Sequence, residues 1–334
     1  MLNFLNFRKL AVTAVFGILA GAVNTSFASP IVRIDGSSTV YPITEAVAED
    51  FQIAKRGSIR VTVGISGTGG GFKKFCRDEI DIVNASRPIK PIEMEVCKKA
   101  GVQYIEMPIA FDALTITVNP RNTWSDTITI AELKKIWEPA AQGKITKWNQ
   151  VNPAWPDKEI KLYGPGADSG TFDYFTEAIV GKTKSSRGDF TAAEDDNVLV
   201  QGVANDMYAL GYFGFAYYIE NKKKIRAVAV DNGNGGVIPS AETVEDTTYR
   251  PLSRPLFIYV KAKSSDKPEI KEFINFFMSN APALVDEVKF FPLPSKAYSL
   301  NIEHFNKKKV GTVFLNESEV GITIEEVMER ETHL

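Results

Sequence analysis

Apolar side chains in the N-terminal third of the chain alternate between the spacing of strands and that of amphipathic helices. Residues 31–34, 59–65 and 80–83 are short apolar or alternating runs that predict strands. Between them, residues 43–51 and 72–75 place apolar side chains on one helical face. This strand-helix order predicts an α/β sheet. Ligands of such sheets bind at the carboxyl ends of the strands, where the loops to the helices begin.

Two later apolar runs predict how the chain is divided. Residues 111–118 and 256–261 are both strand-like and lie roughly half a mature chain apart. A chain of about 300 residues exceeds one usual core, so we expect two lobes. If both runs cross between the lobes, residues 29–111 and 257–334 form the first lobe, and residues 112–256 form an inserted second lobe.

Residues 1–28 have the pattern of a secretory signal peptide. An apolar run over residues 10–23 ends near the small residues Ser26 and Ala28, which suits cleavage after Ala28. A membrane anchor would need a longer unbroken apolar span of about 20 residues. No cysteine follows the run, so a lipid-anchored form is not expected. The sequence therefore predicts a freely soluble, exported protein.

The charge balance argues against a nucleic-acid partner. Removing the signal peptide takes away Arg8 and Lys9, which leaves 37 basic against 41 acidic side chains and a formal charge of −4. A nucleic-acid-binding surface should show a basic excess. The basic runs at residues 222–226 and 307–309 are interpreted as solvated faces. A closed cleft can still hold a small anion with neutral dipoles and one cation.

Cys76 and Cys97 are the only cysteines in the chain. In an exported protein the simplest interpretation is one disulfide between them. Two buried free thiols are the alternative. We expect the disulfide to stabilise the loop that contains residues 85–88.

Three short segments rich in Gly, Ser and Thr, at residues 35–39, 66–71 and 164–171, carry the most information about chemistry. At least two lead into amphipathic helices, whose N-termini offer unpaired N–H groups and a positive dipole end. Alone, each would be an ordinary turn and cap. Together they predict a cage for an oxyanion. The lysine-containing loop of nucleotide hydrolysis is absent, so we expect binding without turnover, cofactor or metal.

Arg87 is the candidate cation for this cage, and it directly follows a predicted strand. Pro88 restricts Arg87 to an extended conformation, which would aim the guanidinium at the cleft for a bidentate contact with an oxyanion. A surface arginine is the alternative interpretation.

Six motifs in fixed order resemble the periplasmic phosphate-binding proteins of ABC transporters. They occupy residues 35–42, 66–72, 84–88, 136–149, 168–172 and 209–214. The resemblance implies a type II periplasmic-binding-protein fold, with two α/β lobes joined by two crossover strands and closing around one phosphate. It also implies a non-enzymatic, monomeric receptor that delivers phosphate to the permease of an ABC transporter.

The family pattern can be transferred onto individual residues. It implies that Thr39 and the Val40 N–H meet one phosphate oxygen, with Ser38 nearby. A hydroxyl of the second loop would come from Ser66 or Thr68. The remaining implied ligands are Ser86, Ser169, Gly170 and Thr171, and the argument from Pro88 adds Arg87.

The chain departs from some relatives in its charged residues. Those relatives place an aspartate where this chain has Arg87, and an arginine just before the triplet that begins at Ser169. The comparison with those relatives implies that the cation has changed lobes and that the usual carboxylate is missing. A carboxylate favours phosphate, which can donate a proton, over sulfate, which only accepts. Asp168 is the best candidate, although it could simply cap a helix. Asp35 and Asp112 are possible substitutes.

The sequence leaves three other functions open. A hydrolase could use Ser38 or Ser169 as nucleophile, but His304 and His333 are the only histidines and no G-x-S-x-G motif occurs. A phosphatase would also need clustered His and Asp metal ligands, which the sequence does not suggest. A receptor for sulfate, molybdate or tungstate is the second alternative. An adhesion or signalling module is the third.

Overall fold

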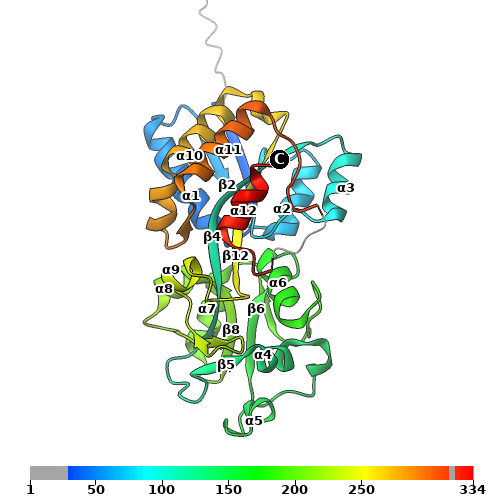
Figure 1. Ribbon diagram of the computed structural model, residues 1–334, viewed down its shortest axis with the longest axis vertical. Coiled ribbons are helices and arrows are strands. Elements are labelled where there is room, and N and C mark those ends of the chain that lie inside the picture. Colours follow the sequence, from blue (N-terminus) through cyan, green and yellow to red (C-terminus); the bar gives the residue numbers. More distant parts are fainter. Residues whose placement is uncertain (1–28, 316–319, 334) are drawn as a thin grey trace, which may run out of the picture.

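The computed structural model describes residues 29–315 and 320–333. The signal-peptide prediction concerns residues 1–28, outside the described part. Figure 1 shows two α/β lobes stacked along the long axis and connected by strands β4 (Tyr104–Val118) and β12 (Ser253–Lys261). The first lobe holds the elements before β4 and after β12, and the second lobe holds those between. Both expected boundaries, at residues 111/112 and 256/257, fall inside these two strands.

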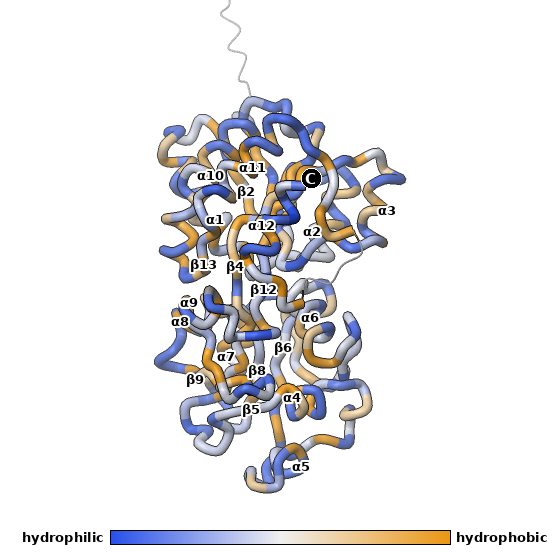
Figure 2. Tube along the Cα trace, viewed as in Figure 1, coloured by the Kyte–Doolittle hydropathy of each residue, from blue (hydrophilic) through white to orange (hydrophobic). Residues whose placement is uncertain are grey.

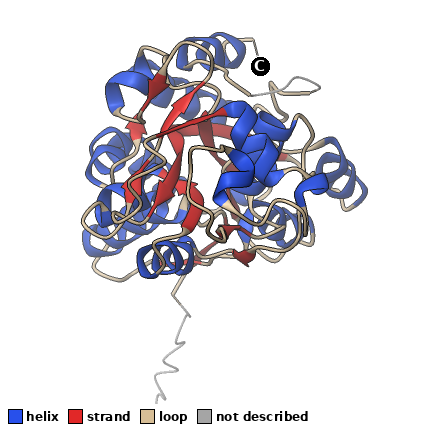
Figure 3. Ribbon diagram, turned by 90° about the horizontal axis from the view of Figure 1, so that it is seen from below, coloured by secondary structure: helices blue, strands red, loops and turns tan. Residues whose placement is uncertain are grey.

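One sheet runs through both lobes in the order β2-β1-β3-β12-β4-β8-β6-β7. Its shorter strands are β1 (Ile31–Gly36), β2 (Arg60–Val63), β3 (Ile82–Ala85), β6 (Lys161–Pro165), β7 (Thr191–Ala193) and β8 (Ala209–Gly214). The first part of β4 pairs antiparallel with β12, and residues 114–118 pair with β8. All 15 residues of β4 are buried, which explains its nearly continuous apolar run. In Figure 3 the strands lie centrally and helices surround them.

Strands β1, β2 and β3 are parallel, and each is followed by a helix. These helices are α1 (Tyr41–Ala54), α2 (Gly67–Cys76) and α3 (Pro91–Lys99). Helices α10 (Pro268–Glu287) and α11 (Ser295–Lys307) complete the first lobe. The Phe51 ring of α1 lies 5.3 Å from that of Phe273 and 5.4 Å from that of Phe276. Amphipathic faces thus determine which helices pack together.

The second lobe repeats this construction around β6, β7 and β8, which are parallel. Its helices are α4 (Ile130–Trp137), α5 (Trp148–Val151), α6 (Gly170–Phe175), α7 (Asp196–Asn205), α8 (Phe215–Asn221) and α9 (Ala241–Glu245). A small sheet contains β5 (Thr127–Thr129), β10 (Ala229–Asp231) and β11 (Gly236–Val237). Tyr212 stacks on Phe175 with ring centroids 3.8 Å apart, and Trp137 packs edge-on against both rings. No described helix is both long and apolar enough to cross a membrane.

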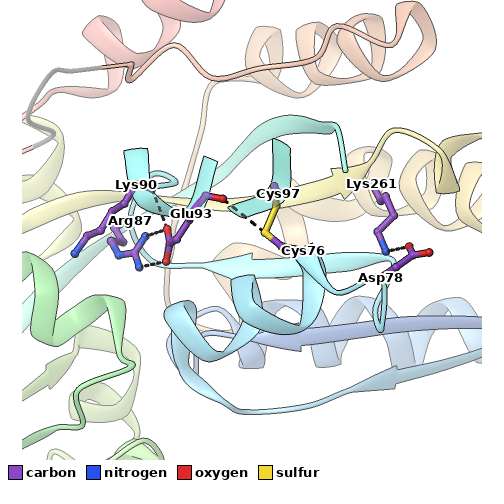
Figure 4. The surroundings of a disulfide bond; sticks show 7 residues. All are labelled: Cys76, Asp78, Arg87, Lys90, Glu93, Cys97 and Lys261. Atoms are coloured by element: carbon purple, nitrogen blue, oxygen red, sulfur yellow. Dashed lines mark hydrogen bonds and ion pairs between the residues drawn. A yellow bond between two sulfur atoms is a disulfide. The ribbon is translucent and has the colours of Figure 1, made fainter. Parts of the chain in front are cut away.

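Cys76 and Cys97 form a disulfide, which confirms that prediction. The bond joins the end of α2 to α3 (Figure 4). It closes the segment that carries β3 and residues 86–90, which lead into the region between the lobes. The free-thiol alternative is therefore wrong.

The chain beyond α11 returns across the crossover strands and ends in helix α12 (Ile324–Glu331), which is mostly hydrophilic in Figure 2. Glu106 of β4 accepts hydrogen bonds from Thr312 Oγ1 at 2.5 Å and from the Val313 N–H at 3.0 Å. The Gly321 N–H donates to the Tyr174 hydroxyl of the second lobe at 3.1 Å. The C-terminal segment therefore contacts both lobes.

Candidate functional site

The first and third glycine-containing loops meet between the lobes. The loop after β1 precedes α1, and the loop after β6 precedes α6. Thr39 Oγ1 of the first loop lies 3.0 Å from Thr171 Oγ1 of the third, and both side chains are fully buried. Ser169 caps α6 by accepting a hydrogen bond from the Thr171 N–H at 3.1 Å. The structure thus brings together predicted site residues that are 132 positions apart.

A second hydroxyl pair lies on the other side of the α6 N-terminus. Thr68 Oγ1 is 3.1 Å from Ser86 Oγ and also accepts a hydrogen bond from the Ser86 N–H. A Cβ placed on Gly170 would lie only 2.5 Å from Ser86 Oγ and 2.6 Å from Thr68 Oγ1. Glycine is therefore needed for the second lobe to approach these hydroxyls. Together the two hydroxyl pairs form a buried set of neutral donors.

The cation at this cluster is Arg254 of β12, which sequence reasoning did not identify. Its Nη2 donates to Thr171 Oγ1 at 2.8 Å and to Thr39 Oγ1 at 3.3 Å. The side chain is fully buried, yet its Nη1 has no hydrogen-bond partner among the described residues. A buried guanidinium nitrogen without an acceptor is costly. The arrangement therefore favours an anionic ligand.

Asp112 of β4 holds Arg254 in place. Its Oδ2 accepts from Arg254 Nη2 at 3.0 Å and from Nε at 3.3 Å, and its Oδ1 accepts from the Phe215 N–H at 3.3 Å. Complete burial raises the pKa of this carboxyl, although Arg254 acts to lower it. The sequence offers Asp112 as a possible proton acceptor for a ligand, but both of its oxygens accept hydrogen bonds from protein donors.

The Arg87 guanidinium donates hydrogen bonds to carboxylates from both lobes. Its two terminal nitrogens bind Glu93 of α3 at 2.8 and 2.7 Å, as Figure 4 shows, and its Nε binds Asp173 of α6 at 2.8 Å. Nη1 also donates to the Pro88 carbonyl at 2.9 Å. Four of the five N–H groups of the guanidinium therefore have protein acceptors. Contact between Arg87 and an oxyanion stays a prediction, and the contacts that are present bridge the two lobes.

Other predicted residues lie at the margin of the cluster. Both Asp168 carboxylate oxygens are 2.9 Å from Lys73 Nζ, and the side chain is 38% exposed. Asp35 binds Ser66 Oγ at 2.6 Å and Lys74 Nζ at 2.5 Å. Thr68, and not Ser66, therefore supplies the hydroxyl of the second loop to the buried cluster.

The remaining predicted residues belong to the first loop. Ser38 is buried, and its carbonyl accepts a hydrogen bond from the Tyr217 hydroxyl of the second lobe at 3.0 Å. Val40 is the N-cap of α1. Helices α1 and α2 both begin at the cluster, so their first-turn N–H groups and dipoles add favourable potential for an anion.

The geometry offers no support for hydrolysis. His304 lies on α11 with its Nδ1 3.5 Å from Glu331 Oε2, outside the hydroxyl cluster, and burial lowers its pKa. In the described part of the chain, no three His, Cys, Asp or Glu side chains are grouped to hold a metal ion. Ser38 and Ser169 thus have no adjacent histidine base.

The chain matches the family model of the PBP superfamily domain over residues 20–281. Protein SphX of Synechocystis sp. is 54% identical over 325 residues, covering 97% of this chain and 96% of that protein. The phosphate-binding protein PstS of Staphylococcus saprophyticus is 40% identical over 272 residues, covering 80% and 82% of the two chains. A proposed phosphate ABC transporter substrate-binding protein from Clostridium perfringens, solved with bound phosphate, has a TM-score of 0.67 and 26% identity over 79% of this chain and 100% of its own.

Proposed function

Because this chain belongs to the PBP superfamily and, within it, to the family of the SphX and PstS proteins, we propose that it binds inorganic phosphate between its lobes and delivers it to an ABC-type permease. The single observation that carries the proposal is the buried Arg254. Its guanidinium contacts hydroxyls from both lobes, and its Nη1 has no acceptor in the described part of the chain. Phosphate supplies several acceptors for such donors.

Each loop has a role in the proposed complex. Thr39 and the Val40 N–H, with Ser38 beside them, bind one side of the ion. The hydroxyl pair of Thr68 and Ser86 donates from the first lobe. The backbone and hydroxyls of residues 169–171 donate from the second lobe. Arg254 supplies the positive charge. Arg87 keeps the lobes together, and Asp168 does so at the surface through Lys73.

Closure of the lobes provides the signal to the permease. The Gly69 N–H donates to the Asp168 carbonyl across the cleft at 2.8 Å, and the Tyr217 hydroxyl binds the Ser38 carbonyl. These contacts belong to a closed arrangement, in which both lobe surfaces are presented together. The receptor works as a monomer in the periplasm, which it reaches by means of the signal peptide at residues 1–28. Phosphate shifts the lobes toward this closed state.

Calorimetric titration of the mature, ligand-stripped protein tests the proposal. We expect one-to-one phosphate binding that persists in excess sulfate and molybdate. Displacement of phosphate by either competitor would instead favour a receptor for another oxyanion. Absence of phosphate binding would refute the proposed ligand. Incubation with a chromogenic phosphoester, expected to release no product, checks the non-enzymatic assignment.

A further inference from the structure

Helix α3 is attached to the first lobe by few apolar contacts. Cys97 is its only buried residue, whereas Ile92 is 67% exposed and Val96 is 47% exposed. Met94 is partly buried against the core. Most helices of globular proteins are held by a buried apolar stripe, and α3 lacks one. The disulfide from Cys97 to Cys76 of α2 is therefore a main attachment of α3 to its lobe.

The same helix carries the carboxylate that binds Arg87 in the first lobe. Glu93 lies one turn before Cys97, and its side chain is 15% exposed. Its carboxylate accepts hydrogen bonds from both terminal nitrogens of Arg87 and from the Lys90 N–H. Cys76 Sγ lies 3.7 Å from the Glu93 carbonyl oxygen, as Figure 4 shows. The disulfide therefore fixes the turn of α3 that presents Glu93 to Arg87.

This turn reaches the second lobe through two cations. Arg87 Nε and Lys90 Nζ each lie 2.8 Å from Asp173 Oδ2 of α6. Asp173 is two residues after Thr171, whose hydroxyl belongs to the buried cluster between the lobes. We call Arg87, Lys90, Glu93 and Asp173 the interlobe clamp. Its three first-lobe members all lie in the loop that the disulfide closes.

The beginning of that loop has an attachment of its own. Asp78, two residues after Cys76, forms an ion pair with the buried Lys261 of β12 (Figure 4). Strand β3 follows, lies between β1 and β12 in the sheet, and is buried throughout. Segments with few buried apolar contacts open locally more easily than core strands do. Loss of the disulfide should therefore loosen α3 and leave β3 in place.

We propose that the Cys76–Cys97 disulfide is a positioning element for lobe closure, because it holds Glu93 where that carboxylate directs Arg87 onto Asp173. This inference rests on the proposed function. The disulfide acts on phosphate only through the interlobe clamp. A clamp that is ordered beforehand loses less conformational entropy when the lobes close. Since the clamp joins the two lobes, loosening it should mainly speed the release of phosphate.

A double-mutant cycle between the disulfide and Arg87 tests this role. Cys76→Ala combined with Cys97→Ala should weaken phosphate binding about 3- to 10-fold in calorimetry, with faster release in stopped-flow measurements. In an Arg87→Met background the same pair of substitutions should change affinity by less than about 2-fold, because the clamp is already broken. Asp78→Asn is the matched control. It weakens the ion pair at the start of the same loop, so it should lower the melting temperature and leave phosphate affinity unchanged.

Two results of the cycle would overturn the inference. One is folded disulfide-free protein with wild-type phosphate affinity. The other is an equal loss of affinity in the wild-type and Arg87→Met backgrounds, since the disulfide would then act by a route other than the clamp. Wild-type protein that binds no phosphate would instead refute the proposed function, and the first titration detects this separately.

A second test uses the native disulfide and needs no cysteine variant. Dithiothreitol reduces the disulfide to two thiols and is itself oxidised to a cyclic disulfide, which requires local opening of α3. Saturating phosphate should slow this reduction about 3- to 10-fold, because coupling between ligand binding and the disulfide is reciprocal. Phosphate should protect the disulfide of Arg87→Met much less. Equal protection in wild type and Arg87→Met would overturn the inference.

Discussion

Two buried arginines lie where the lobes meet, and they differ in how their donors are used. Arg87 is 3% exposed and gives four N–H groups to protein acceptors, among them carboxylates from each lobe. Arg254 is fully buried, has one carboxylate partner, and keeps Nη1 without an acceptor in the described chain. Burial and charge alone therefore do not identify a binding cation. The proposed binding cation is distinguished by a whole guanidinium nitrogen without an acceptor in the described chain, because buried N–H groups require acceptors.

Replacing Arg254 should have the largest effect. Arg254→Ala removes the proposed ligand cation and leaves Asp112 buried without its partner. We expect phosphate affinity to fall about 100-fold or more, and stability to fall by about 3–5 kcal/mol. Titration calorimetry and thermal unfolding measure the two effects. Arg254→Lys keeps the charge and should remain better folded while still losing about 10-fold in affinity, because lysine lacks the guanidinium fork. Unchanged affinity in folded Arg254→Lys would count against a bidentate role.

Gly170, the first residue of α6, lies against the hydroxyls of Thr68 and Ser86. Gly170→Ala would place a methyl group within 2.6 Å of Thr68 Oγ1 and Ser86 Oγ, so the lobes could not close fully. Because overpacking a close contact is destabilising, we expect phosphate affinity to fall about 10- to 100-fold. Gly188→Ala is the matched control, since its new Cβ meets only Gln142 Oε1 at 3.5 Å. Small-angle scattering of both variants with phosphate would reveal a failure to close.

Arg87→Met directly tests the contrast between the two arginines. It keeps the length of the side chain but leaves Glu93 and Asp173 without their shared partner. We expect a clear loss of stability, about 3 kcal/mol, and a loss of phosphate affinity below about 10-fold that reflects weaker closure. Thermal melts and titrations report these separately. If Arg87→Met weakened phosphate binding as strongly as Arg254→Ala, Arg87 would be a direct ligand, as the sequence pattern predicts.

The smallest effect is expected for two buried carboxylates that have no ion pair with an arginine in the described part of the chain. Burial raises the pKa values of both Glu106 and Glu331, and Glu331 raises that of Glu106 further. Their folded pKa values exceed the unfolded ones, so the stability they contribute is complete below the unfolded pKa and declines as the pH rises through the folded pKa. The melting temperature should therefore fall between about pH 5 and 9.

Glu331→Gln checks this pH dependence. Glutamine cannot ionise, so the melting temperature of the variant should change less with pH than that of the wild type. The difference should correspond to about 1 kcal/mol of unfolding free energy. Glu329→Gln, on the same helix but more exposed, serves as control. A parallel pH profile for wild type and Glu331→Gln would show that Glu331 does not titrate in this range.

Sequence reasoning predicted the α/β class, the helix-opening loops and the disulfide. Local signals sufficed, because glycine, hydroxyl caps and paired cysteines act over short spans of chain. Through the family resemblance it also placed Thr39, Thr171 and either Ser66 or Thr68 in one site. Arg254 was overlooked although it interrupts a strongly apolar strand, and a charge inside such a run is itself a signal of a buried partner.

The sequence by itself determined which segments form strands, helices and donor-rich loops, since these depend on periodicity and on local backbone preferences. Tertiary structure decided which cation faces the site. Arg254 lies 215 positions from Thr39, and only the antiparallel pairing of β12 with β4 brings them together. The same folding gives Arg87 its two carboxylate partners, Glu93 and Asp173. Pairing of buried charges depends on contacts between distant segments, which neither spacing nor composition specifies.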